Sequence, residues 1–219
     1  MNRLRTGAVT RRLALLAVPL TLFVGGCTGS PADDSAPKPP AAAERPSPFR
    51  DCAALSAAPT PSPGAVSAPP AANTAPAGGP ELPALTLPCF TGGAPVALRD
   101  VAGPAVINVW ASWCGPCRKE LPAFQRLSER TAGQLQVVGV NTRDSRSGAQ
   151  SIGEDFGVRF PVLVDQGDAL QRELRRNAFP LTLFVDAAGR IRHVDATGAL
   201  DDAQLSTLVR AHLGVAVPA

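Results

Sequence analysis

The chain has 219 residues, of which 45% are apolar and 18% charged, and its 23 prolines and 20 glycines exceed what one compact domain usually contains. Its formal charge of +3 arises in the first 26 residues, which hold four arginines and no acid, so that the remainder has 21 − 4 = 17 basic against 18 acidic groups. This balance excludes the electrostatic signature of a nucleic-acid-binding protein, and the length predicts one folded domain plus additional sequence.

The N-terminal residues 1–26 have the three parts of a signal peptide. A cationic stretch ends at Arg12, an apolar run of 12 residues covers 13–24, and two glycines follow. A membrane-spanning helix needs roughly 20 apolar residues, so cleavage is expected instead. The small residues before Cys27 resemble the lipobox of bacterial lipoproteins, which implies a lipid on Cys27 and an anchored protein on the extracytoplasmic face of the cell membrane. The arginine pair leaves both Sec and twin-arginine export open.

Residues 27–80 are expected to form a tether. The segment 28–80 holds 13 of the 23 prolines and is rich in alanine and serine. Such a segment cannot bury enough apolar surface to offset its ordering entropy, and proline favours extended conformations. One patch within it, Phe-Arg-Asp-Cys-Ala-Ala-Leu at 49–55, has the apolar residues that docking on a domain would require.

From residue 81 onward, apolar runs alternate with turn residues, which indicates a folded domain over 81–219. Strands are predicted at 105–110, 135–140, 161–165, 181–185 and 190–196, and helices at 116–131, 145–156, 168–176 and 201–213. Residues 186–189 are typical of a hairpin turn. This order predicts an α/β domain in which helices flank a mixed central β-sheet.

The sequence Trp113-Cys114-Gly115-Pro116-Cys117 lies where the first buried strand leads into a helix. At a helix N-terminus, the unpaired N–H groups and the helix dipole favour the thiolate of Cys114. Cys117 lies three positions later on the same face, and Pro116 suits the first helical turn. The spacing predicts a redox-active pair in which Cys114 attacks a substrate sulfur and Cys117 resolves the mixed disulfide.

The remaining cysteines and the histidines allow further interpretations. A single Cys-x-x-Cys pair could be half of a zinc site, but the chain has no second pair and its histidines are His193 and His212 alone. We therefore expect no metal and no cofactor, and interpret both histidines as surface or packing residues. Cys52 and Cys89 remain, which predicts a structural disulfide in an oxidising compartment. Two free buried cysteines, or a second redox pair that relays electrons to Cys114, are the alternatives.

Three motifs carry a resemblance to a known family. They are Asn-Val-Trp-Ala-Ser-Trp-Cys-Gly-Pro-Cys-Arg-Lys-Glu-Leu-Pro at 108–122, Gly-Val-Asn at 139–141, and Phe-Pro-Leu-Thr-Leu-Phe at 179–184. Through them the segment 81–214, 134 of the 219 residues, resembles the TlpA/ResA-like thiol-disulfide oxidoreductases of the thioredoxin superfamily. The resemblance implies a thioredoxin fold with an N-terminal strand extension and a central helical insertion.

The resemblance also implies roles for individual residues. It places a cis Phe179–Pro180 bond beside Cys114 and lets the backbone of Phe179 pair with an extended substrate peptide. It assigns to Glu120 the modulation of thiol ionisation or a proton shuttle, although the helix dipole alone also favours an acid there. Asp144 falls where relatives can carry a second acid, but we prefer to interpret it as a solvated loop residue.

Asn108 stands where thioredoxin has a buried aspartate that accepts a proton. Because an amide cannot accept that proton, the resemblance leaves the task to Glu120 or water. Trp110 and Trp113 are expected to pack against the disulfide and border the site, and Trp113 and Pro116 to contact the substrate.

These features predict an extracytoplasmic, membrane-anchored thiol-disulfide oxidoreductase. The Gly-Pro dipeptide between the cysteines favours a reductant of exported proteins with cysteine pairs, such as apocytochromes c, and the family implies a membrane thiol protein as electron donor. A disulfide-forming oxidase would use the same residues in the opposite direction and stays open. A copper metallochaperone, which would use a longer cysteine spacing, and a peroxidase, which would use a single cysteine, fit less well. Arginine outnumbers lysine 19 to 2, which we attribute to codon composition rather than to a binding site.

Overall fold

The computed structural model describes residues 45–59 and 78–218. These residues belong to one compact unit that begins at Arg45, upstream of residue 81. The expected signal peptide, the expected lipidation site Cys27 and most of the expected tether lie outside the described residues. Within the described ranges, no helix is long and apolar enough to cross a membrane.

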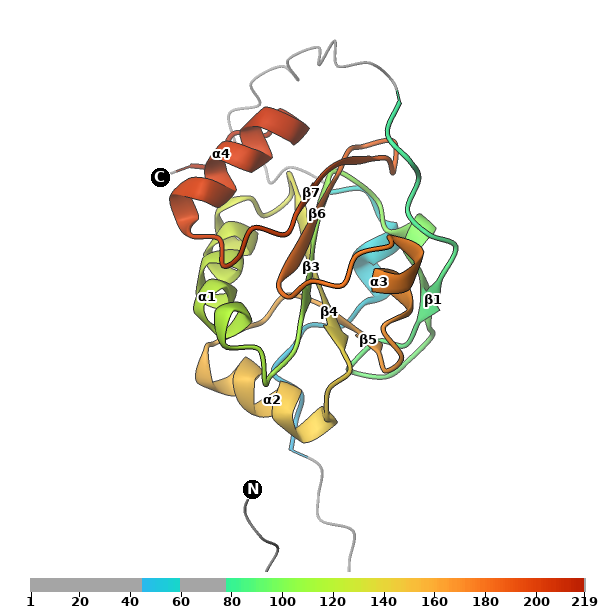
Figure 1. Cartoon of the computed structure of the whole chain (residues 1–219), viewed down its shortest axis with the longest axis vertical. Coiled ribbons are helices and arrows are strands. Elements are labelled where there is room, and N and C mark those ends of the chain that lie inside the picture. The colour runs from blue at the N-terminus through green and yellow to red at the C-terminus, as the bar shows by residue number, and fades with distance from the viewer. Residues whose placement is uncertain (1–44, 60–77, 219) are drawn as a thin grey trace, which may run out of the picture. The chain divides into compact units, whose positions relative to one another are not determined.

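A five-stranded mixed sheet forms the centre of the unit, with the strand order β5-β4-β3-β6-β7 (Figure 1). The strands are β3 Ala105–Trp110, β4 Gln136–Thr142, β5 Val162–Asp165, β6 Leu181–Val185 and β7 Ile191–Asp195. The helices are α1 Gly115–Arg130, α2 Arg146–Asp155, α3 Ala169–Glu173 and α4 Asp202–Leu213. Strands β3, β4 and β5 are parallel, and β6 runs antiparallel to β3 and β7. The predicted mixed α/β fold and the predicted order of elements are confirmed.

Alternation along the strands creates two apolar cores, one on each face of the sheet. Val106 and Phe184 pack under α1, α2 and α4, whereas Ile107 and Leu183 pack on the opposite face. Successive side chains of a strand point to opposite faces, so a continuous apolar run such as that of β3 is explained by burial on both sides. Figure 1 shows α1, α2 and α4 on one side of the sheet and α3 with β1 on the other.

The second face is covered by α3 and by four short elements that precede β3. These are the 3-10 helices Ala53–Ser56 and Leu98–Asp100 and the antiparallel pair β1 Thr86–Leu87 and β2 Val96–Ala97. Cys89 pairs with Leu163 of β5 as an isolated antiparallel bridge. The outer edge of β5 is therefore covered, which removes an exposed strand edge from the sheet.

Residues 45–59 pack against this covered edge. Phe49 is buried and meets the ring of Phe90 edge to face, with 4.7 Å between ring centroids. Cys52 is joined to Cys89 by a disulfide with a Cα–Cα distance of 6.0 Å. Leu55 is buried in the core on the opposite face from Phe49. Apolar side chains and one covalent bond thus hold this segment on the domain.

Candidate active site

The two cysteines of the Trp-Cys-Gly-Pro-Cys motif lie at the start of α1. Cys114 is the N-cap residue of the helix, and its Sγ is bonded to the Sγ of Cys117, with a Cα–Cα distance of 5.3 Å. The backbone N–H of Cys117 donates to Cys114 Sγ at 3.1 Å. Cys114 is 5% exposed and Cys117 is fully buried, so Cys114 is the sulfur that a partner reaches. Pro116 is exposed in the first turn, where its missing N–H costs no helical hydrogen bond.

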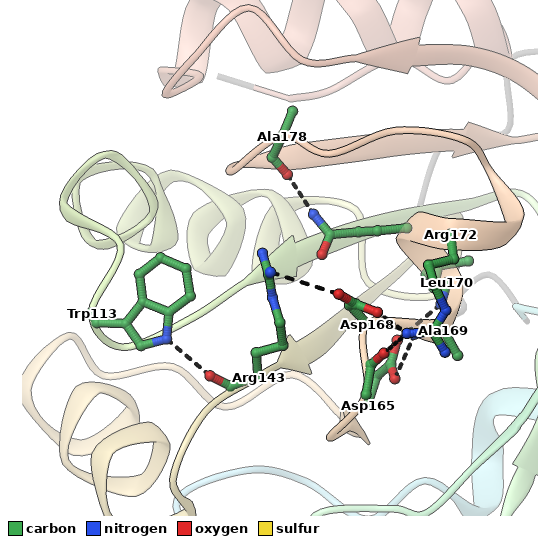
Figure 2. A network of polar contacts seen from close by, with 10 residues as sticks. Trp113, Arg143, Asp165, Asp168, Ala169, Leu170, Arg172 and Ala178 are labelled. Carbon is green, nitrogen blue, oxygen red and sulfur yellow. Dashed lines mark hydrogen bonds and ion pairs between the residues drawn. The ribbon is translucent and has the colours of Figure 1, made fainter.

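An exposed aromatic surface adjoins the disulfide. The side chain of Trp113 is 56% exposed, and its ring meets that of Phe179 edge to face, with 5.0 Å between centroids. Trp113 Nε1 donates to the carbonyl of Arg143 at 3.0 Å, as Figure 2 shows. The guanidinium of Arg143 lies 5.1 Å from the centroid of the Phe179 ring. The Phe179–Pro180 bond is cis, and Pro180 is buried. These residues form a contact surface beside Cys114.

Glu120 is the buried acid of the site, one turn of α1 after Cys117. It is 1% exposed; its Oε1 accepts from Asn108 Nδ2 at 2.7 Å and its Oε2 accepts from the Leu200 N–H at 3.1 Å. Burial is the main cause that raises the pKa of Glu120 to about 7; the two hydrogen bonds oppose this shift, and the charge of Asp195 adds a smaller upward contribution. A carboxyl group that titrates near neutral pH is suited to give or accept a proton.

The Asn108 side chain contacts Glu120 through one of its two polar atoms. Its Nδ2 donates to the carboxylate, while its Oδ1 is buried and has no hydrogen-bond partner within the described ranges. A half turn of the amide would present Oδ1 to a protonated Glu120. The amide itself does not titrate, so Glu120 is the titratable group of this buried pair.

Two expectations about neighbouring residues are wrong in part. Asp144 lies in the loop after β4 but is half-buried: its carboxylate accepts from the Ser112 N–H at 2.5 Å, from Ser112 Oγ at 2.6 Å and from Asn141 Nδ2 at 2.8 Å. It therefore fixes the loop that leads into Cys114. Trp110 is fully buried in the same core as Cys114 and Cys117, so it does not line the exposed border of the site as Trp113 does. A Cβ at Gly139 would lie 2.9 Å from Trp110 Nε1, so the indole requires glycine on the adjacent strand.

The fold also brings together residues that the sequence did not connect. Arg143 directly follows β4, but no pattern indicated that its guanidinium would lie over the Phe179 ring. His193 and His212 stack with 4.1 Å between ring centroids and an interplanar angle of 2°. Among the residues that the structure describes, no group of three or more histidine, cysteine or acidic side chains could hold a metal ion.

The mixed sheet and the cysteine pair at the start of its first long helix define a thioredoxin-fold domain with a dithiol site. The profile of the AhpC/TSA family matches residues 79–194, more than half of the chain, and the chain belongs to this family of the thioredoxin superfamily. The superfamily is the one that the resemblance of the sequence motifs indicated.

Named relatives extend the comparison. The thiol-disulfide oxidoreductase ResA of Bacillus subtilis (strain 168) is 27% identical over 117 residues, which cover 52% of this chain and 65% of that protein. The thiol:disulfide interchange protein DsbE of Pseudomonas fluorescens biotype C is 33% identical over 116 residues, which cover 52% of this chain and 64% of that protein. The chain thus spans under two thirds of the length of these relatives. The crystal structure of a secreted thiol-disulfide isomerase from Corynebacterium glutamicum has a TM-score of 0.51 and 26% identity, covering 61% of this chain and 83% of that one.

Proposed function

We propose that this protein is an extracytoplasmic thiol-disulfide oxidoreductase that reduces cysteine pairs in exported proteins. The observation that carries the proposal is the Cys114–Cys117 disulfide at the N-terminus of α1, with one sulfur reachable and the other buried. The printed names of the relatives, a thiol-disulfide oxidoreductase and a thiol:disulfide interchange protein, support the same reaction class.

The reaction proceeds as two thiol-disulfide exchanges. In the reduced protein, the thiolate of Cys114 attacks one sulfur of a client disulfide, forms a mixed disulfide and releases one client thiolate. The thiolate of Cys117 then attacks Cys114 Sγ, releases the second client thiolate and forms the Cys114–Cys117 disulfide. Two electrons pass to the client, and its two thiolates take up two protons. The Cys117 N–H, which points to Cys114 Sγ, stabilises negative charge on that sulfur.

Glu120 is proposed to accept the proton of the buried Cys117 thiol before the second exchange. Its support is its position one turn along α1, its burial, and a pKa raised to about 7 by that burial. Asp144 and Asn108 act through other residues and are positioning residues: the first fixes the loop before Cys114, and the second holds the Glu120 carboxyl group.

The client is proposed to lie extended across the exposed surface of Trp113 and Phe179. The half-buried Phe179 precedes β6, so its backbone is placed to pair with an added strand. Pro116 and Pro180 would border the same path. The membrane anchor on Cys27, a membrane thiol protein as electron donor, and apocytochromes c as clients belong to the proposal and rest on the sequence and its resemblance.

Disulfide formation in exported proteins is the second candidate. The N-cap position of Cys114 favours it, because a helix N-terminus stabilises the thiolate and so the reduced form, which makes the disulfide more oxidising. The Gly-Pro dipeptide between the cysteines favours the reductant. The two directions therefore differ in one measurable quantity, the reduction potential of the Cys114/Cys117 couple.

The test is an equilibration of the protein across thiol buffers, with the Cys114/Cys117 and Cys52/Cys89 couples followed separately by mass spectrometry. A potential near about −270 mV supports the reductant, and one near about −120 mV overturns that direction in favour of the oxidase. Cys117→Ser is the matched variant: it should trap a mixed disulfide with a client peptide, whereas Cys114→Ser should trap none. Absence of exchange with every disulfide tested would contradict the proposed reaction class itself.

A further inference from the structure

Four of the 19 arginines gather around one pocket that shares Arg143 with the aromatic surface beside Cys114. Arg143 follows β4, whereas Arg172, Arg175 and Arg176 lie in α3 and immediately after it. They line a pocket of about 360 Å³, here called the arginine pocket. The composition gave no reason to assign these arginines to a site, but their convergence from two separate segments does.

The arginine pocket keeps an excess of positive charge. Its one acidic lining residue is Asp168, which forms ion pairs with Arg143, at 3.6 Å, and with Arg172 (Figure 2). Arg175 and Arg176 are exposed, and neither forms an ion pair with any residue that the structure describes. The pocket therefore has four guanidinium groups and one carboxylate, and within the described part of the chain the guanidinium groups of Arg175 and Arg176 are free to pair with a ligand.

Unusual backbone geometry is concentrated at the same pocket. Arg143, Asp168 and Arg175 have φ angles of 50°, 54° and 52°, and they are the non-glycine residues with positive φ in the described part of the chain. All three line the arginine pocket. Non-glycine residues in this conformation cost free energy, and such costs collect at ligand clamps and active sites. The strain points to a functional reason for how these side chains are presented.

The wall of the pocket holds a buried hydrogen-bond acceptor. Gln171 lines it and is 3% exposed; its Nε2 donates to the carbonyl of Ala178 at 2.7 Å, but its Oε1 has no partner among the described residues. An acidic polypeptide offers several carboxylates along one chain, which a cluster of guanidinium groups can bind together, and it also offers backbone N–H donors. We propose that the arginine pocket binds an acidic stretch of the client polypeptide, carboxylates to the guanidinium groups, and that the buried Gln171 amide must rotate before its Oε1 accepts a backbone N–H.

The arginine pocket and the dithiol share Arg143. Its carbonyl accepts from Trp113, the neighbour of Cys114, and its guanidinium lies over Phe179. A client held at Cys114 and extended along Phe179 would therefore continue into the pocket. This inference rests on the proposed function and deepens it, because it makes acidic residues near the client cysteine a determinant of specificity.

The test compares two peptides that contain the same internal disulfide, one flanked by four aspartates and the other by four asparagines. The measured quantity is the ratio of their second-order rate constants with the reduced protein. We expect a ratio of about 10 at low salt, since several charge pairs form at a partly exposed site, and a decline toward 1 as salt screens them. In Arg175→Gln/Arg176→Gln the ratio should fall to about 2 or less, whereas Arg50→Gln/Arg210→Gln, which removes two exposed arginines outside the pocket, should keep it.

A binding measurement separates the pocket from the chemistry. A cysteine-free aspartate peptide should bind the oxidised wild-type protein in calorimetry and slow exchange with the acidic substrate, while inorganic phosphate at equal ionic strength should not. Equal rates for the two disulfide peptides without binding of the aspartate peptide overturn the inference, and so does inhibition by phosphate alone. Absence of exchange with both disulfide peptides overturns the proposed function, and the calorimetry then still decides whether the pocket binds an acidic peptide.

Discussion

Replacing Glu120 by glutamine is expected to stabilise the folded protein at and above neutral pH. Burial raises the pKa of Glu120 from its ordinary 4.5 to about 7. Between these values the unfolded chain has lost the proton that the folded protein still holds, so stability falls as the pH rises from about 4.5 to about 7 and then stays constant. At about 1.36 kcal/mol per pH unit, ionised Glu120 lowers the free energy of unfolding by about 3 kcal/mol.

Glutamine avoids this loss because it does not ionise, and its shape is close enough to that of glutamate to keep both hydrogen bonds. Its Oε1 can accept from the Leu200 N–H, and its Nε2 can donate to Asn108 Oδ1, which has no partner within the described residues, after a half turn of the Asn108 amide. Below pH 4.5 the two proteins should be about equally stable. If one of the two hydrogen bonds forms poorly, the gain at pH 8 is smaller by about 1 kcal/mol.

The assay is urea unfolding of the oxidised protein from pH 4.5 to 8.5, for the wild type, Glu120→Gln and the control Glu129→Gln. Glu129 lies on the same helix but is exposed, so its replacement should leave the pH profile unchanged. The comparison with the wild type matters because burial also lowers the pKa of His212, which makes stability fall toward acidic pH in every variant. A difference between wild type and Glu120→Gln that does not grow with pH would refute the reasoning.

Three further changes test the structure around the site. The double variant Cys52→Ala/Cys89→Ala should lose about 3 to 4 kcal/mol of stability in urea unfolding, because the disulfide spans 37 residues. It should keep thiol exchange in a peptide assay, and loss of exchange would favour an electron relay. Asp144→Ala should lower the free energy of unfolding by about 2 kcal/mol and slow thiol exchange, because it loosens the loop before Cys114. Asp144→Asn should restore part of the stability and part of the exchange rate. Unchanged exchange rates in both variants would contradict a positioning role. Gly139→Ala should lower the thermal midpoint, at a cost of about 1 to 3 kcal/mol, since the added Cβ meets Trp110; an unchanged midpoint would show that the core can adjust.

Local sequence patterns determined most of the fold. The nearly continuous apolar run at 105–110 was predicted as a strand and forms β3 with the same bounds, because a strand buried on both faces is apolar at almost every position. The helix predicted at 116–131 forms α1 from Gly115 to Arg130, since the cysteine motif, proline and Gly133 mark its ends. The proximity of Cys114 and Cys117 follows from their spacing alone, as one helical turn connects them.

The bounds of two elements differ most from the prediction. The strand predicted to end at residue 140 continues to Thr142, because β5 pairs with Asn141 and Thr142, and Asn141 finds a partner in Asp144. The helix predicted at 168–176 ends at Glu173, shortly before Arg175 adopts a positive φ. The polar side chains of Asn141 and Thr142 suggested the end of the strand, but backbone pairing with β5 keeps both residues in the sheet.

The sequence by itself identified the dithiol, its order of attack and the disulfide partners as expectations. The tertiary structure alone decided that Glu120 is buried with a raised pKa, that Trp113 rather than Trp110 faces solvent, and that Arg143 joins α3 in a charged pocket. The first group depends on neighbours along the chain, whose spacing fixes their geometry. The second depends on which side chains meet across the sheet and between loops, and burial, pKa and charge convergence exist only once those distant segments are packed together.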